Sequence, residues 1–176
     1  MAFSTIGHST RSIEEFLELL QQAGIQKVID VRRLPGSTRY PQFNQDALSA
    51  SLAEAGIRYH WAEGLAGRRT VSKQIDFQTN VWWQNRSFHN YADHALGDEF
   101  REALAELRKQ GEAEPLAIMC SEAVWWRCHR RIIADYLLAA GEQVRHIMAV
   151  GNAPEAELSA GAVVQADGRI CYPATD

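Results

Sequence analysis

Reactive side chains follow short apolar runs at three separate points of the chain. They are His8 after residues 3–6, Asp30 and Arg32 at the end of residues 28–31, and Cys120 and Glu122 at the end of residues 116–120. Apolar runs of this length are typical of strands buried on both faces of a parallel sheet. Ligands of such sheets bind beyond the carboxyl ends of the strands. If the three runs are neighbouring parallel strands, these five side chains meet at one edge and form a site.

Cys120 has two interpretations. We expect a helix over about residues 124–140, which places Cys120 between a strand end and a helix start, where the helix dipole lowers the pKa of a thiol. Three basic residues, Arg127, Arg130 and Arg131, follow in that helix and favour a thiolate. The alternative is a buried cysteine that ends a core strand, which is common. The sequence leaves both interpretations open.

The reactive residues divide into catalytic roles. Cys120 or Glu122 would act as nucleophile or general base. His8 or His129 would carry protons, because imidazole titrates near neutral pH. A cysteine phosphatase loop has an arginine after five intervening residues and contains glycine, whereas this chain has Trp126 at that position and no glycine. The spacing excludes that class and weakens a rhodanese-like interpretation.

Arginine clusters are the second chemical theme. A guanidinium group recognises phosphate or carboxylate through planar, bidentate hydrogen bonds. In a chain of net charge −4, such clusters predict a confined anion site, and their alternative role is surface salt bridging. The predicted anion-binding arginines are Arg32, Arg33, Arg39, Arg68, Arg69, Arg127, Arg130 and Arg131.

Trp82 and Trp83 also have two interpretations. They lie beside Asn85 and Arg86 in a polar stretch and could stack on a nucleic-acid base. Alternatively, they form a hydrophobic plug that holds this stretch against the core.

No metal and no cofactor is expected. Zinc sites normally contain short ligand pairs such as C-x-x-C. Cys120 is separated by seven residues from Cys128 and His129, and the spacing of His89 and His94 does not suit one helical face. A half-buried Cys128 beside a hydrogen-bonded His129 is the simpler interpretation.

The elements that would position these residues alternate between strand and helix. Ser12 and Glu15 form a capping box before an apolar helical face that ends at Gly24, and the same pattern recurs from Asn44 to Gly56. The expected strands are residues 3–6, 28–31, 57–60, 116–120 and 144–148, and the later helices are residues 98–111, capped by Asp98, and about 124–140. This alternation predicts an α/β fold with a mainly parallel central sheet and helices on both faces, a three-layer α/β/α arrangement.

The 176 residues are expected to form a single α/β domain over residues 1–176. Residues 64–97 are polar and weakly periodic, and a stretch of this length is usually functional or covers a site. Residues 150–176, with Gly161 and Gly168, are expected to form a small hairpin or tail.

Charge and cysteine content limit the partners. A net charge of −4 disfavours nucleic-acid binding over the whole surface, although a local basic site is compatible with it. The chain start does not resemble a signal peptide, and no apolar run approaches the roughly 20 residues that cross a bilayer. Three cysteines, an odd number, do not suggest a disulfide framework. We therefore expect a cytoplasmic protein with reduced thiols and no membrane partner, and the sequence predicts no oligomeric state.

Seven motifs, taken together and in this order, resemble the domain of unknown function 488 family. They are Gly7–Arg11, Asp30–Arg32, Pro41–Asn44, Leu65–Arg69, Tyr91–Asp93, Met119–Glu122 and Cys128–Arg131, within about residues 3–148. Leu65-Ala66-Gly67 departs from the usual Leu-Gly-Gly of the family. The resemblance implies a compact α/β domain of a bacterial or archaeal cytosol, with no assigned reaction. Its motif positions correspond to His8, Ser9, Asp30, Arg32, Cys120, Glu122, Cys128, His129 and Arg130, which adds Ser9 and Asp30 to the predicted anion-binding residues.

Three functions are compatible with these observations. The leading hypothesis is a small enzyme that acts on a phosphate-bearing or other anionic substrate, such as a nucleotide or a modified base. The second is a non-catalytic module that binds a nucleotide or nucleic acid through arginine and tryptophan. The third is a thiol redox sensor that uses Cys120 and Cys128. The alkylation rate of Cys120 at neutral pH separates a reactive thiol from a core cysteine.

Overall fold

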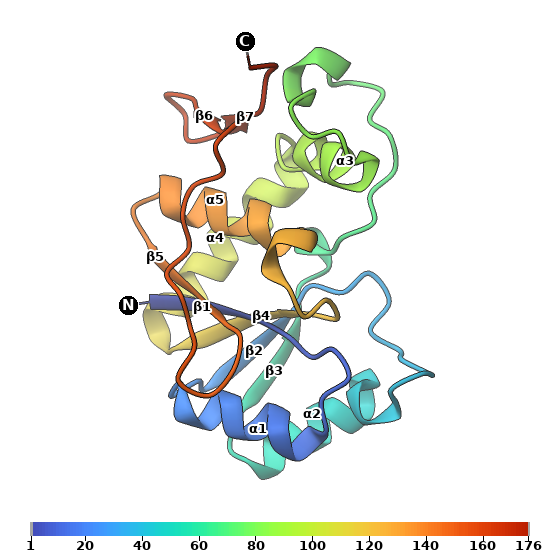
Figure 1. The fold of residues 1–176 in the computed structure, drawn as a ribbon, viewed down its shortest axis with the longest axis vertical. Helices are drawn as coiled ribbons and strands as arrows, with labels where there is room; N and C mark the ends of the chain where they lie inside the picture. Colours follow the sequence, from blue (N-terminus) through green and yellow to red (C-terminus); the bar gives the residue numbers. More distant parts are fainter. Residues whose placement is uncertain (1, 176) are drawn as a thin grey trace.

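The computed structural model describes residues 2–175, and its centre is one sheet of five parallel strands (Figure 1). The strands are β1 (Ala2–Gly7), β2 (Lys27–Asp30), β3 (Arg58–Trp61), β4 (Leu116–Cys120) and β5 (Gln143–Ile147). Their order across the sheet is β3-β2-β4-β1-β5, and every neighbouring pair is parallel. The strands β1, β2 and β4, which precede the predicted site residues, are therefore adjacent.

Helices cover both faces of this sheet. The helices α1 (Ile13–Gln22) and α2 (Gln45–Glu54) pack on one face, and α4 (Asp98–Ala113) and α5 (Arg130–Ala139) pack on the other (Figure 1). This arrangement confirms the predicted three-layer α/β/α fold. The capping box that starts α1 is also confirmed, because the Glu15 backbone N–H donates to Ser12 Oγ over 3.1 Å and Ser12 N–H donates to Glu15 Oε1 over 3.2 Å.

The strands β1 and β4 each contribute to two separate cores. Phe3 and Ile118 pack toward α4 and α5, whereas Ile6 and Met119 pack toward α1 and α2. All five residues of β4 are buried, as expected for a strand with helices on both faces. Burial of each large apolar side chain contributes about 1.5–3 kcal/mol, so a shift of one residue in register would be costly.

The connections that leave β1 and β4 run over opposite faces of the sheet. Helix α1 leads from β1 to β2 on one face, and α5 leads from β4 to β5 on the other. Because β1 and β4 are neighbours, their outgoing chains diverge and leave a crevice at the carboxyl ends of the strands. Such switch points are the usual ligand sites of open α/β sheets.

The predicted start of the last helix was wrong. A helix was expected from residue 124, but α5 begins at Arg130. A short 3₁₀ turn at Trp125–Arg127 comes first, and Cys128 then has an extended backbone, with φ −127° and ψ 148°. The extended residue interrupts the helical hydrogen bonds, so Cys120 is not at a helix start.

The predicted limits of the preceding helix were also wrong. Gly97, not Asp98, is the N-cap of α4, and the helix continues through Gly111 to Ala113. A Cβ atom at position 111 would overlap the ring of Phe3 on β1. Glycine therefore occupies this position because the helix and the sheet approach closely there, and not because the helix ends.

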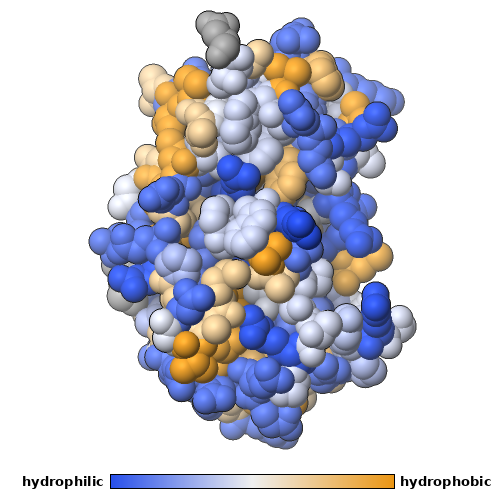
Figure 2. Space-filling model, in the orientation of Figure 1, coloured by the Kyte–Doolittle hydropathy of each residue, from blue (hydrophilic) through white to orange (hydrophobic). Residues whose placement is uncertain are grey.

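The remaining segments add local elements at the periphery. Residues 64–97 contain α3 (Arg86–His94), with short 3₁₀ helices at Glu63–Leu65 and Phe77–Asn80. The strands β6 (Val163–Val164) and β7 (Ile170–Cys171) form an antiparallel hairpin within residues 150–176. The face drawn in Figure 2 is mostly hydrophilic, with small separate hydrophobic patches. Within residues 2–175, no helix is both long and apolar enough to cross a membrane.

The close approach of Gly111 to Phe3 gives a stability prediction. We expect Gly111→Ala to destabilise the protein by about 1–3 kcal/mol, because the added methyl group overpacks a dense core. Urea unfolding followed by circular dichroism measures the loss. The exposed neighbour substitution Glu112→Ala is the control and should change stability by less than about 0.5 kcal/mol. Equal effects of the two substitutions would contradict this account of Gly111.

Candidate functional site

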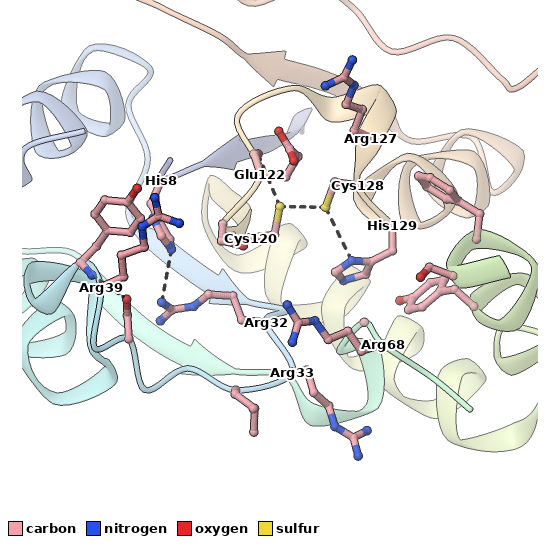
Figure 3. A pocket seen from close by; sticks show the side chains of 18 of the residues that line it. His8, Arg32, Arg33, Arg39, Arg68, Cys120, Glu122, Arg127, Cys128 and His129 are labelled. Carbon is pink, nitrogen blue, oxygen red and sulfur yellow. Dashed lines mark hydrogen bonds between the residues drawn. The ribbon is translucent and has the colours of Figure 1, made fainter. Parts of the chain in front are cut away.

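A cleft of about 590 Å³ opens at the carboxyl ends of β1, β2 and β4 (Figure 3). Its walls come from the loops that follow these strands, from Gly67 and Arg68, and from the first turns of α3. The deep part of the lining is formed by His8, Arg32, Cys120, Cys128 and His129, and the exposed part carries Arg33, Arg39, Arg68, Glu122 and Arg127. The structure thus brings together most of the residues that the sequence singled out.

Arg130 is buried beneath the two cysteines and is fully shielded from solvent. Its Nε donates to Cys120 Sγ over 3.0 Å, its Nη1 to Thr5 Oγ1 over 2.9 Å, and its Nη2 to the Glu122 carbonyl over 2.7 Å. Within the described chain, no carboxylate pairs with this guanidinium. A buried charge without a counterion costs several kcal/mol, so the charge of Arg130 requires an anion nearby.

The two thiols are the groups that can supply this anion. Cys120 Sγ and Cys128 Sγ lie 2.7 Å apart, and the backbone N–H of Arg130 points at Cys128 Sγ over 3.4 Å. Burial opposes ionisation of Cys128, but its hydrogen bond with Cys120 and the charge of Arg130 prevail and lower its pKa to about 7. Burial, together with the hydrogen bond to Cys128, raises the pKa of Cys120 well above the ordinary thiol value. Cys128 is therefore the sulfur of the pair that ionises near neutral pH, while Cys120 stays a thiol.

Cys128, and not Cys120, occupies the position that favours a thiolate. Cys128 lies just before α5, where free backbone N–H groups stabilise negative charge. Cys120 ends the central strand, is 3% exposed, and packs within the hydrophobic core. Its Sγ lies 3.6 Å from the Glu122 carbonyl oxygen. In the sequence, the Cys-His-Arg-Arg run is the pattern that could have pointed to Cys128. It does so only once the helix is known to begin at Arg130.

His129 is oriented for proton exchange with Cys128. Its Nε2 donates to the Val31 carbonyl over 3.0 Å, which leaves Nδ1 free to accept a proton from Cys128 Sγ, 3.6 Å away (Figure 3). Burial lowers the pKa of His129 to about 4, so the ring is neutral at physiological pH. A Cβ atom at Gly67 would lie 2.8 Å from this ring, so the glycine makes room for it.

His8 lies across the cleft from His129 and is also neutral. Its ring stacks on Phe43 with a centroid distance of 4.3 Å, and its Nδ1 donates to the Ser9 carbonyl over 2.9 Å. Burial lowers the pKa of His8 to about 4. Its Nε2 therefore accepts from Arg32 Nη1, 3.4 Å away, while the side chain of Ser9 lies outside the cleft lining.

Asp30 and Arg32 brace the deep part of the cleft. Arg32 Nη2 and Nε donate to the two Asp30 carboxylate oxygens over 2.7 and 3.0 Å, and Arg32 Nη1 donates to the Phe43 carbonyl over 2.7 Å. The Tyr59 hydroxyl adds a further bond to Asp30 over 2.5 Å. Asp30 is completely buried, so its carboxylate holds Arg32 in place and does not reach a ligand.

Four exposed arginines surround the cleft opening: Arg33, Arg39, Arg68 and Arg127. None of them pairs with a carboxylate of residues 2–175. Glu122 is the one acidic side chain among the described lining residues, and its Oε1 accepts from the backbone N–H of Val124 over 3.4 Å. The opening therefore carries excess positive charge, which favours an anionic ligand.

Arg69 and Arg131 lie outside the cleft, and so does Arg130, which is buried beneath the thiols. Arg69 donates to the carbonyls of Glu63 and Ala66 over 2.6 and 2.9 Å and so stabilises a turn. The Arg131 guanidinium lies 5.0 Å from the Trp83 ring centroid and donates to Ser159 Oγ over 3.0 Å. Both side chains have intramolecular partners, which removes them from anion binding.

Trp82 and Trp83 also lie outside the cleft. Trp83 is 7% exposed and stacks on Phe88, with 4.9 Å between centroids. Trp82 stacks on Tyr172 of the C-terminal tail, and its indole fills the space beside Gly161. These contacts correspond to the hydrophobic plug and not to a base-stacking platform.

The fold and the cleft define a class of small, parallel α/β proteins with a pair of thiols above a buried arginine. The family model described as "Domain of unknown function DUF488" matches residues 12–137, which is most of the chain and lies within the resemblance noted over residues 3–148. The chain therefore belongs to the DUF488 family. Comparisons with curated proteins and with solved structures gave no match.

The charge of Arg130 gives a prediction about Cys128. In a Cys171→Ser background, the ultraviolet absorbance of the thiolate should rise with pH around a midpoint of about 7. The additional substitution Arg130→Met should move this midpoint upward, because the thiolate loses its counterion, whereas Arg130→Lys should move it less. In Cys128→Ser, any transition that remains belongs to Cys120. An unchanged midpoint in a folded Arg130→Met protein would contradict the role assigned to this charge.

Proposed function

We propose that this protein is an enzyme that acts on a phosphate-bearing or other anionic substrate, with Cys128 as its nucleophile. The observation that carries the proposal is the buried Arg130, which has no carboxylate partner in residues 2–175 and lies against two thiols at the bottom of an arginine-rimmed cleft. A buried guanidinium without a counterion is costly, so Arg130 favours a thiolate on the neighbouring cysteines. These cysteines lie at the bottom of the cleft, where an anionic substrate would bind.

The substrate would be held at the cleft opening. Arg33 and Arg39 lie in the loop after β2, Arg68 follows β3 and Arg127 follows β4, so they can bind an anionic group from several directions. A volume of about 590 Å³ lies within the range of small-molecule sites and suits a nucleotide or a modified base. The thiolate of Cys128 would then attack an electrophilic atom next to the anionic group.

Proton transfer would depend on neutral imidazole. His129 Nδ1 can take the proton of Cys128 when the sulfur is protonated and can return it to the leaving group. His8 and Glu122 line the same cleft and are further candidates for proton transfer to or from the substrate. Cys120 would supply the hydrogen bond that keeps the charge on Cys128.

A non-catalytic module that binds nucleic acid has less support. Its stacking residues would be Trp82 and Trp83, but neither lines the cleft. Trp82 packs on Tyr172, and Trp83 packs on Phe88 and Arg131.

Alkylation with charged and uncharged reagents tests the proposal. In a Cys171→Ser background at pH 7, Cys128 should react with iodoacetate faster, relative to iodoacetamide, than an ordinary thiol does, because the rim arginines concentrate the anionic reagent. Arg68→Ala should lower this preference by about tenfold at low salt. Rates are measured by mass spectrometry of the modified protein.

The matched control is Arg101→Ala, since Arg101 is exposed on α4 and does not line the cleft. It should leave the reagent preference unchanged, and inorganic phosphate should slow alkylation of the parent protein. An equal reagent preference in the parent and the Arg68→Ala protein, with no protection by phosphate, would refute the anion site.

A further inference from the structure

The second thiol of the site is not explained by a single nucleophile. A nucleophilic Cys128 needs a counterion and a proton acceptor, which Arg130 and His129 supply. Cys120 adds a sulfur in direct contact with Cys128, 2.7 Å away, on the buried side of the cleft. Any group bound covalently to Cys128 would therefore have a second sulfur next to the new bond.

From this contact we infer that Cys120 and Cys128 form a two-thiol reducing centre that cleaves anionic disulfides. The inference rests on the proposed function, since it uses the same cleft and the same nucleophile. It names the substrate class: a molecule that carries a carboxylate or phosphate beside a sulfur–sulfur bond. The anionic group would bind the rim arginines, and the disulfide would reach Cys128.

The first step is an exchange at Cys128. Its thiolate attacks one sulfur of the substrate, a new bond forms between Cys128 and that sulfur, and the substrate disulfide breaks. The electron pair of the broken bond leaves on the other sulfur, which departs as a thiolate and takes a proton from solvent. The result is a mixed disulfide between Cys128 and half of the substrate.

After the first step, Cys120 is the thiol whose ionisation Arg130 favours. Once Cys128 is in a disulfide, Arg130 has lost its anion while remaining buried, and its Nε still points at Cys120 Sγ from 3.0 Å. Ionisation of Cys120 restores a counterion, so the guanidinium now favours the second thiolate. His129 is the neighbouring base that can receive the released proton. A single arginine thus activates the two sulfurs in succession.

The second step releases the product. The thiolate of Cys120 attacks Cys128 Sγ, a disulfide forms between the two cysteines, and the mixed disulfide breaks. The second half of the substrate leaves as a thiolate. The substrate disulfide has gained two electrons and become two thiols, and the protein pair has lost two electrons. A low-molecular-weight dithiol would reduce the protein disulfide and complete the cycle. Because the two side chains already touch, the bond requires only a small movement.

A coloured anionic disulfide, dithiobis(nitrobenzoate), tests both steps in one turnover. Each of its halves carries a carboxylate, and each released half is a visible thiolate. Cys171 is partly exposed and would react separately, so every protein carries Cys171→Ser. We expect two coloured thiolates per chain, a protein that has lost two hydrogen atoms, and no attached nitrobenzoate by mass spectrometry.

The matched variant is Cys120→Ser, with Cys120→Ala as a second version in case the buried hydroxyl destabilises the fold. Either one should release one coloured thiolate and retain the other half of the reagent on Cys128. Circular dichroism checks that the variants are folded. Arg68→Ala should slow the reaction with this reagent about tenfold and leave the rate with uncharged dithiodipyridine unchanged.

The outcomes separate this inference from the proposed function. If nitrobenzoate remains on Cys128 although Cys120 is present, Cys120 does not resolve the adduct and the inference fails. The proposed function would survive that result, provided that iodoacetate still reacts preferentially. If Cys128 reacts with neither anionic reagent faster than a free thiol does, both proposals fail.

Discussion

The buried charge of Arg130 is the interaction on which the site depends. Its donors reach Thr5 on β1, Cys120 at the end of β4, and the carbonyl of Glu122 in the loop that follows. Thr5 in turn donates to His146 Nδ1 on β5 over 2.6 Å. One guanidinium therefore links three neighbouring strands to the first turn of α5, and the position of the thiol pair follows from it.

The architecture could be predicted from the sequence, whereas the identity of the thiolate could not. The apolar runs around Val28 and Ile118 and the helices between them indicate a parallel sheet, and the residues after its strands do meet in one cleft. The extended backbone of Cys128 leaves no trace in apolar periodicity. When the helix is taken to start at residue 124, its dipole is assigned to Cys120. The wrong sulfur is then predicted to form the thiolate.

The arginines show a second limit of sequence reasoning. Arg32, Arg69 and Arg131 have the same chemistry as Arg68, and all were expected to bind anions. Arg32 is held by Asp30, Arg69 by backbone carbonyls, and Arg131 by aromatic rings and Ser159. Except for Asp30, these partners are distant along the chain or belong to its backbone, so residue type and spacing do not distinguish a structural guanidinium from a free one.

The strand order has a consequence for how the protein acquires its chemistry during synthesis. The strand β4 lies between β1 and β2, although 108 residues separate it from β1 and 85 residues separate it from β2. A ribosome-bound chain that ends before residue 116 has an open slot in its sheet, with unpaired backbone groups along β1 and β2. Contacts of such long sequence separation form slowly. Such an unfinished chain holds no cysteine, and the low pKa of Cys128 arises only when β4 and α5 have closed the slot.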